Sequence, residues 1–312
     1  MTARAGWVLL LPLLACGLRR GNGADSPDAG SNAVDGGQPQ ARTPVLDVPY
    51  DDSAPGDALR KLDIYPPPSG SSAPVVVWVH GGAWMTGDKQ NQLADKVAWA
   101  NGQGLLFVSV NYRLSPAPTA PPAPGRVMHP VHAQDVARAI SWVKAHAAEY
   151  GGDGTRVGLL GHSAGAHLVS LVATSSEFLG AHGLGPSSIR CTGSLDTEGY
   201  DVPAVMADAT GTQRALYVNA FGTDEATWTA ASPTFQVKQG AGIGDFLVAR
   251  RGSAARVAAA NAFRDALDQA GVPVQVVDVS AYTHEGVNDA VGQSGETVLT
   301  PALSAFFAAC LE

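Results

Sequence analysis

The stretch TRVGLLGHSAGAHL, residues 155–168, decides the fold that the sequence predicts. Its first part is apolar and predicts a strand, its last part favours a helix, and Gly161-His162-Ser163-Ala164-Gly165 lies where the two meet. In this G-x-S-x-G pattern the two glycines allow a sharp turn and a close approach of strand and helix, which lifts the serine hydroxyl above a sheet. Ser163 is therefore a candidate nucleophile, provided that the rest of the chain supplies a sheet and a base.

Short β-branched runs alternate with longer helical patterns from about residue 45 onward, and no internal repeat is present. This alternation predicts an α/β fold, with a mostly parallel sheet covered by helices on both faces. Strands are expected at 60–67, 73–82, 104–114, 155–160, 188–196, 245–252 and 272–280. Helices are expected at 91–101, 131–149, 164–175 and 299–311, and residues 197–240 are expected to form loops that help to build the substrate pockets.

The composition is that of a globular protein without a polyanionic partner. The chain has 312 residues, of which 45% are hydrophobic and 15% charged, enough to bury a sizeable core. The formal net charge is −8, and the basic residues are scattered along the sequence. Because nucleic acid binding requires a positive patch or stripe, the sequence excludes a nucleic acid partner.

The first sixteen residues, MTARAGWVLLLPLLAC, are typical of a bacterial export signal. Arg4 precedes an apolar run at 7–15, which is too short to span a bilayer of about 30 Å as a helix. The end of this segment is similar to the lipobox of bacterial lipoproteins, which predicts a lipid on Cys16; the alternative is ordinary cleavage beside an incidental cysteine. Residues 17–44 are rich in Gly, Ser, Asp and Pro and predict a disordered linker. We expect an exported cell-envelope protein that contacts the membrane only through this anchor.

Two cysteines remain if Cys16 carries lipid, namely Cys191 and Cys310. An even pair in an oxidising compartment favours a disulfide bond between them. Two buried free thiols are the alternative, because cysteine packs well as a small apolar residue.

The base that would activate Ser163 can be sought among eight histidines. At a strand–helix turn of this kind the nucleophile precedes the histidine in the chain. That order excludes five: His80, His129, His132, His146 and His162. His167 falls inside the helix after the turn, and His182 lies in a Gly-rich connection. His284 is expected in a loop after the strand at 272–280, at the same edge of the sheet as Ser163, and a surface histidine is the alternative.

A second motif, HGGAW at residues 80–84, follows an early predicted strand. Small residues there let backbone N–H groups turn toward a bound carbonyl oxygen and stabilise its negative charge. The expected oxyanion donors are the N–H groups of Gly82 and Ala83, with that of Ala164 after the nucleophile. Trp84 is expected to form a wall of the acyl site.

Four segments together, HGGAW, VNYRLSP, HPVHAQDVARAISWV and GHSAGAHL, resemble the α/β-hydrolase superfamily. They are similar to its esterase group of feruloyl and acetylxylan esterase-type enzymes, kynurenine formamidases and hormone-sensitive-lipase-like esterases. The resemblance covers residues 57–311 and implies a catalytic domain at 45–312. It implies hydrolysis of a carboxylic ester, or less often an amide, through an acyl-enzyme on Ser163 and without a cofactor.

The acid that should orient His284 departs from the family pattern. Family members usually carry an aspartate after the penultimate strand, but residues 250–264 contain neither Asp nor Glu. Asp245 precedes that strand and Asp265 falls inside the next helix. We expect Asp196, at the carboxyl end of the preceding strand, to act instead. Two alternatives lie close to it in the sequence, Glu198 and Asp201.

The sequence also raises the question of a metal site and of two functions other than ester hydrolysis. His129, His132 and Asp135 recur three residues apart, but Pro130 interrupts the turn, and Asp135 is expected to pair with Arg113, so no metal is predicted. The main hypothesis is a serine esterase acting on a small-molecule or polysaccharide-linked ester. An arylformamidase-type amidase and a non-catalytic binding protein with the same fold are the alternatives.

Overall fold

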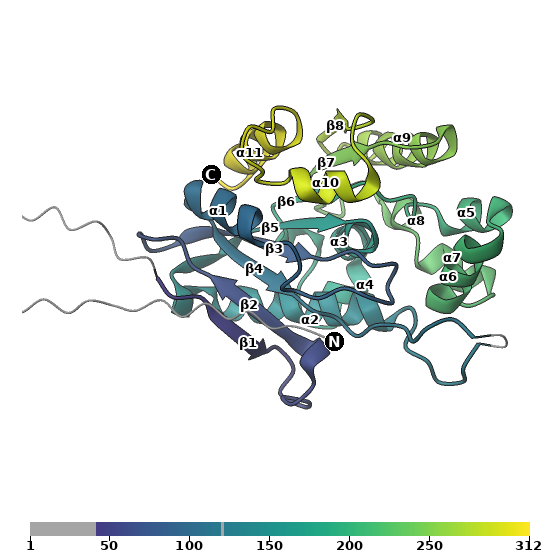
Figure 1. Ribbon diagram of the computed structural model, residues 1–312, viewed down its shortest axis with the longest axis horizontal. Coiled ribbons are helices and arrows are strands. Elements are labelled where there is room, and N and C mark those ends of the chain that lie inside the picture. The colour runs from purple at the N-terminus through teal and green to yellow at the C-terminus, as the bar shows by residue number, and fades with distance from the viewer. Residues whose placement is uncertain (1–41, 120–121) are drawn as a thin grey trace, which may run out of the picture. The chain divides into compact units, whose positions relative to one another are not determined.

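The computed structural model describes residues 42–119 and 122–312 (Figure 1). The predicted signal segment, lipidation at Cys16 and nearly all of the linker lie outside the described residues. The first strand, β1, begins at Val45.

An eight-stranded sheet runs through the molecule in the order β1-β2-β4-β3-β5-β6-β7-β8 (Figure 1). Strands β1 and β2 pair antiparallel with each other, and β2 pairs antiparallel with β4. From β4 to β8 all pairs are parallel. The strand bounds are β1 Val45–Pro49, β2 Lys61–Tyr65, β3 Ala73–Val79, β4 Leu106–Val110, β5 Gly152–His162, β6 Cys191–Leu195, β7 Asp245–Arg250 and β8 Val274–Asp278.

Helices cover both faces of this sheet (Figure 1). Their bounds are α1 Ala94–Gly102, α2 Val131–His146, α3 Ala164–Thr174, α4 Ser176–Gly180, α5 Val202–Asp208, α6 Gly211–Phe221, α7 Glu225–Ala230, α8 Pro233–Gln236, α9 Ala254–Gln269, α10 His284–Ala290 and α11 Leu299–Cys310. Within residues 42–119 and 122–312, none of these helices has the length and hydropathy of a membrane span.

The central strand β3 shows how the sequence produces this layered packing. Its residues APVVVWV alternate between the two faces, and nearly all are buried. Val75, Val77 and Val79 belong to the apolar cluster that includes α2, α3 and α9, whereas Val76 and Trp78 belong to the cluster on the side of α1 and α11. A strand buried on both faces explains the continuous apolar run. The predicted α/β fold is confirmed.

The structure corrects two expectations about loops. Residues 197–240 contain the four short helices α5, α6, α7 and α8. Two of them begin at aspartate caps, because Asp201 accepts from the N–H of Ala204 and Asp224 from that of Thr227. His284 is likewise the first residue of α10, which Thr283 caps.

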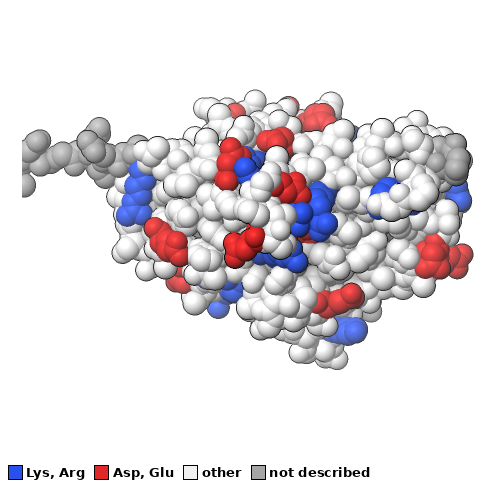
Figure 2. Space-filling model, turned by 90° about the horizontal axis from the view of Figure 1, so that it is seen from below, with Lys and Arg blue, Asp and Glu red and all other residues white. Residues whose placement is uncertain are grey.

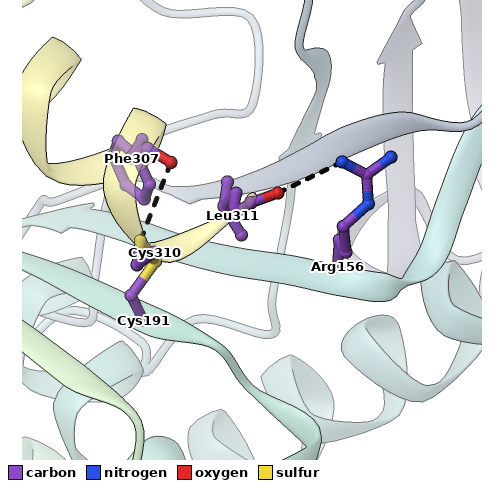
Figure 3. The surroundings of a disulfide bond; sticks show 5 residues. All are labelled: Arg156, Cys191, Phe307, Cys310 and Leu311. Atoms are coloured by element: carbon purple, nitrogen blue, oxygen red, sulfur yellow. Dashed lines mark hydrogen bonds between the residues drawn. A yellow bond between two sulfur atoms is a disulfide. The ribbon is translucent and has the colours of Figure 1, made fainter.

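A disulfide joins Cys191, the first residue of β6, to Cys310, the last residue of α11 (Figure 3). The bond closes a separation of 119 residues. Close to it, Arg156 donates to the backbone carbonyl of Leu311 at 3.2 Å. Of the two alternatives for these cysteines, the structure contains the disulfide.

Charged side chains of both signs are intermixed on the face of the molecule shown in Figure 2. Many of the basic groups are engaged in ion pairs, such as Arg60 with Asp51 and Arg156 with Asp153.

Candidate active site

Ser163 lies on a strained turn between β5 and α3. Its backbone angles are φ 56° and ψ −119°, a conformation that non-glycine residues rarely adopt. The flanking glycines make room for this turn: a Cβ on Gly161 would lie 2.5 Å from the carbonyl carbon of Gly165, and one on Gly165 would lie 2.0 Å from the carbonyl oxygen of Val79. These positions therefore require glycine, and the serine is held at the carboxyl edge of the sheet.

The structure brings Ser163, His284 and Asp196 into one chain of hydrogen bonds. His284 Nε2 lies 3.0 Å from Ser163 Oγ, and His284 Nδ1 lies 2.6 Å from Asp196 Oδ2. An ionised carboxylate can only accept, so Nδ1 carries the proton and Nε2 is left to accept the serine proton. The Asp196 side chain is 1% exposed, whereas that of His284 is 37% exposed and faces the site.

Asp196 follows β6 directly and adopts φ 51°. Its own N–H donates to the carbonyl of Ala249 in β7, and the N–H of Ser163 donates to the carbonyl of Leu195, both at 2.9 Å. The nucleophile and the carboxylate are therefore anchored on the ends of the adjacent strands β5 and β6. The two alternative acids have other partners, since Asp201 caps α5 and Glu198 pairs with Arg256.

Two arginines hold the Asp196 carboxylate ionised. Burial alone raises the pKa of Asp196, but hydrogen bonds from His284, Arg256 and Arg251 outweigh burial and place that pKa well below its usual range. Arg256 Nη2 donates to Oδ1 at 2.7 Å, and Arg251 Nη1 donates to Oδ2 at 3.0 Å. Both arginines come from residues 250–264, where the resemblance led us to expect the family's acid. In this chain the acid directly follows β6, and two cations occupy the segment after β7 where the resemblance implies an acid.

The HGGAW motif forms a tight loop beside the serine. Gly82, Ala83 and Trp84 all have positive φ, at 113°, 51° and 58°. The carbonyl of Gly82 accepts from the N–H groups of two later residues, which are Met85 and Thr86. Within the part of the chain that the structure describes, the N–H groups of Gly82, Ala83 and Ala164 donate to no other group. These three predicted donors are therefore free to bind an oxygen atom at Ser163.

Ser163 borders two cavities. One, of 360 Å³, has a polar wall that includes the three carboxamides Asn91, Gln92 and Asn288. The other, of 340 Å³, is lined by the side chains Trp84, Leu216 and Tyr217 with the Asp196 and Arg256 pair at its side.

Trp84 takes the position expected of a wall beside the nucleophile. Its indole N–H donates to His167 Nδ1 at 3.2 Å, and its ring packs edge-on against Tyr217 and Phe221. The His167 Nε2–H in turn donates to the carbonyl of Ala231 at 2.7 Å. His167 therefore holds Trp84 in place and does not itself line either cavity.

His132 and Asp135, which share the spacing of metal ligands, have structural partners instead. Asp135 forms a two-pronged ion pair with Arg113, as predicted, at 2.7 and 2.6 Å. His132 Nε2 lies 3.0 Å from Ser115 Oγ. Among the described residues, the one cluster with metal-ligand spacing consists of His162, Asp196 and His284, whose ligand atoms lie within 4.8 Å of one another. Their hydrogen bonds and the adjacent Arg251 and Arg256 make this a poor place for a cation.

Comparison with known proteins places the chain in a family. The BD-FAE family model matches residues 62–239, more than half of the chain. The chain belongs to the BD-FAE family. This BD-FAE chain is 39% identical over 134 residues to "Esterase LipQ" of Mycobacterium tuberculosis. The aligned residues make up 42% of this chain and 29% of LipQ. It is 43% identical over 102 residues to "Probable carboxylic ester hydrolase LipM" of the same organism, which covers 33% of the chain and 22% of LipM. The match therefore spans less than a third of the length of each of these two relatives.

Solved structures similar to this BD-FAE chain share its fold. A truncated carbohydrate esterase from gut microbiota superposes with a TM-score of 0.69 at 18% identity, covering 87% of this chain and 97% of the other. "Esterase B from Lactobacillus Rhamnosis" superposes with a TM-score of 0.67 at 22% identity, and the match covers 87% of each chain. The α/β-hydrolase fold and the resemblance to its esterase group are confirmed.

Sequence reasoning missed the side chains that hold Asp196 and the backbone at His284 in place in the BD-FAE site. His162, which chain order excludes as the base, donates from Nε2 to the carbonyl of His284 at 3.0 Å. Arg251 and Arg256 carried a signal, because the run ARRGSAAR stands where an acid was missing. A cationic segment in place of a carboxylate suggests that the carboxylate comes from a neighbouring strand.

Proposed function

We propose that this chain is a serine hydrolase that cleaves carboxylic esters through an acyl-enzyme on Ser163. The observation that carries the proposal is the hydrogen-bond chain from Asp196 through His284 to Ser163, which ends between two cavities. The family and the names of the M. tuberculosis relatives support the same reaction class.

In this mechanism Ser163 Oγ attacks the ester carbonyl carbon while its proton passes to His284 Nε2. The tetrahedral intermediate collapses, the C–O bond to the alcohol breaks, and His284 returns the proton to the departing alkoxide. Water then attacks the acyl-enzyme while His284 accepts one of its protons. As the bond between the acyl carbon and Ser163 Oγ breaks, His284 returns this proton to Oγ, which releases the carboxylic acid and restores Ser163. Asp196 holds the imidazole in the required tautomer and balances its charge when it is protonated.

The N–H groups of Gly82, Ala83 and Ala164 supply the oxyanion site in this proposal. They are fixed by the positive-φ loop at 82–84 and by the first turn of α3, so they need no reorganisation when charge develops on the oxygen. Preorganised donors of this kind stabilise the transition state more than the bound ester.

The substrate we propose is an ester of a hydroxyl-rich alcohol, either a small molecule or a polysaccharide. Three carboxamides, Asn91, Gln92 and Asn288, line the 360 Å³ cavity and offer donors and acceptors to several hydroxyl groups. The titles of two structural neighbours, a carbohydrate esterase and a bifunctional "GH43-CE" of Bacteroides eggerthii, support this choice.

We also propose that the protein is exported and anchored by a lipid on Cys16. This rests on the sequence of residues 1–16 alone. Fractionation of cells that express Cys16→Ser tests it: the variant should leave the membrane fraction, and its retention after a salt wash would contradict the anchor.

The reaction is tested with purified wild type, Ser163→Ala and the control Ser187→Ala, whose exposed serine precedes β6 at the opposite edge of the sheet. The substrates are nitrophenyl acetate, butyrate and a longer ester, a feruloyl ester, an acetylated oligosaccharide and an aryl formamide. Ser163→Ala should lose about 10⁴-fold or more of the ester turnover, while Ser187→Ala keeps it. Equal turnover in Ser163→Ala would refute the mechanism, and a preference for the formamide would replace the esterase with an amidase.

A further inference from the structure

The segment that carries His284 is held in place by side chains from three separate elements. Each side chain donates a hydrogen bond to a backbone carbonyl of residues 282–288. The bonds are Arg251 Nε to Tyr282 O at 2.8 Å, His162 Nε2 to His284 O at 3.0 Å, and Lys96 Nζ to Asn288 O at 2.8 Å. The donors come from the end of β7, the end of β5 and α1.

Arg251 differs from the other two donors because it also binds the acid. While its Nε holds the carbonyl of Tyr282, its Nη1 donates to Asp196 Oδ2 at 3.0 Å. That same oxygen accepts from His284 Nδ1 at 2.6 Å. A guanidinium is planar and rigid, so one side chain fixes the distance between the carboxylate and the segment that carries the imidazole.

We propose that Arg251 is a positioning residue for the Asp196–His284 pair. It sets the geometry of the pair through the acid and the base segment together, and it does not touch the substrate. This inference rests on the proposed function, because it assigns Arg251 to the alignment of the same hydrogen-bond chain.

The unusual place of the acid explains why such a residue is needed. Asp196 directly follows β6, whereas His284 follows β8, and β7 lies between these two strands in the sheet. His284 begins a helix of only seven residues, so the helix itself anchors it weakly. Arg251, directly after β7, spans the intervening strand and links the two ends.

Arg256 supports the carboxylate without making this link. Its Nη2 donates to Asp196 Oδ1 at 2.7 Å and to the Asp196 carbonyl at 3.2 Å, and its other terminal nitrogen pairs with Glu198. A buried carboxylate would still have one cationic partner if Arg251 were removed. Loss of Arg251 therefore misaligns the pair more than it discharges the acid.

The test compares Arg251→Met and Arg251→Lys with wild type and with the control Arg156→Met. Arg156 is a matched control because it also binds one carboxylate, that of Asp153, and donates to backbone carbonyls, including Leu311 (Figure 3). Its side chain is 29% exposed and that of Arg251 is 21% exposed, and Arg156 lies toward the other end of β5 from Ser163.

We expect Arg251→Met to lower kcat for nitrophenyl acetate by roughly 10- to 100-fold, because small misplacements of a catalytic group have effects of this size. KM should change by no more than about two-fold, since the residue does not bind substrate. Arg251→Lys should recover part of the loss, because an ammonium can keep one of the two bonds. Arg156→Met should change neither kcat nor KM.

Amide hydrogen exchange of residues 282–290 supplies a readout that does not depend on activity. We expect faster exchange there in Arg251→Met and no change there in Arg156→Met. Unchanged exchange together with unchanged kcat would overturn the role of Arg251, as would a loss of kcat that Arg251→Lys does not partly recover. Activity that is insensitive to Ser163→Ala would instead overturn the proposed function, and the exchange result would still decide whether Arg251 holds the segment.

Discussion

Ser163 and Asp196 both adopt backbone angles that residues other than glycine rarely adopt, with φ of 56° and 51°. Each such residue costs roughly 1–3 kcal/mol and persists where the surrounding structure enforces it. Here the N–H of Ser163 donates to the carbonyl of Leu195, so the strained turn of the nucleophile is bonded to the residue before the acid. The two strained positions are thus built on neighbouring strand ends as one unit.

The role of the acid is tested by Asp196→Asn. We expect kcat to fall by about 10⁴-fold, because the amide can stabilise the wrong imidazole tautomer and cannot balance its charge. The change is isosteric, and circular dichroism and the melting temperature show whether the fold is retained. Steady-state kinetics with nitrophenyl acetate measures the effect.

Asp201→Asn is the matched control, because Asn caps a helix about as well as Asp and should keep α5 in place. Its turnover should stay near that of wild type. If Asp196→Asn keeps more than about a tenth of the turnover, another carboxylate orients the imidazole, and Glu198 is the next to replace.

At the scale of elements, α6 meets the HGGAW loop in the wall of the 340 Å³ cavity. Leu216 and Tyr217 of α6 line it together with Ala83 and Trp84. Trp84 is fixed by its contacts with His167 and Tyr217, so Leu216, which is only partly buried, is the wall residue with the greatest freedom to change.

Leu216→Ala should therefore widen this cavity and favour longer acyl chains. We expect the ratio of kcat/KM for the butyrate ester to that for the acetate ester to rise by roughly 10-fold, the lower end of what one methylene is worth in a hydrophobic pocket. Val218→Ala is the control, since Val218 lies on the same helix but does not line this cavity. An equal ratio in wild type and Leu216→Ala would show that the acyl group does not occupy this side of Ser163.

The long buried elements could be predicted from the sequence, and the short capped ones could not. The APVVVWV run marked β3, and LTPALSAFFAACL marked α11, because periodicity and burial act over many residues. Helices α5 to α8 have between four and eleven residues, and their starting signals are single polar caps such as Asp201 and Asp224, which are also common in loops. For the same reason the sequence predicts a loop at His284, where the structure has the first residue of α10.

The candidate site was predictable where chain order constrained it. Ser163 and His284 followed from the turn motif and from the order of nucleophile and base, and the absence of a carboxylate at 250–264 pointed to Asp196. The contacts of Arg251 and His162 with the base segment were not predictable, because they join residues 31 and 122 positions apart through side chains without a motif.

At the scale of the whole molecule, four histidines link stability to pH: His132, His162 and His167 are buried, and His129 is half-buried. Burial lowers the pKa of His129 and His167 to about 4 and that of His132 and His162 to about 3. Each titrates near 6.5 in the unfolded chain, so between pH 6.5 and about 4 the unfolded state binds more protons than the folded state. Stability from these groups is fully present above pH 6.5 and is lost as the pH falls.

We therefore expect the free energy of unfolding to fall below pH 6.5, with each of these histidines contributing about 1.4 kcal/mol per pH unit. Urea denaturation at pH 7.5, 5.5 and 4.5 measures this slope. In His129→Phe the phenyl ring would pack where His129 contacts Phe178 and Phe221. This variant should lower the slope of the unfolding free energy against pH by about 1.4 kcal/mol per pH unit, the effect of one proton. The exposed His146 is the control, and a slope that His146→Gln changes as much as His129→Phe would contradict the assignment to these four histidines.

The disulfide closes a covalent ring in the carboxyl-terminal part of the protein. The ring of chain from Cys191 to Cys310 contains Asp196, Arg251 and His284, whereas Ser163 and the oxyanion loop lie before it. A protease that nicks the chain once at 237–243 leaves its two pieces linked through sulfur, with the acid on one piece and the imidazole on the other. A single nick at 180–185, outside the ring, instead separates a fragment with the attacking oxygen from a fragment with the proton relay, so that esterase activity would report their reassembly.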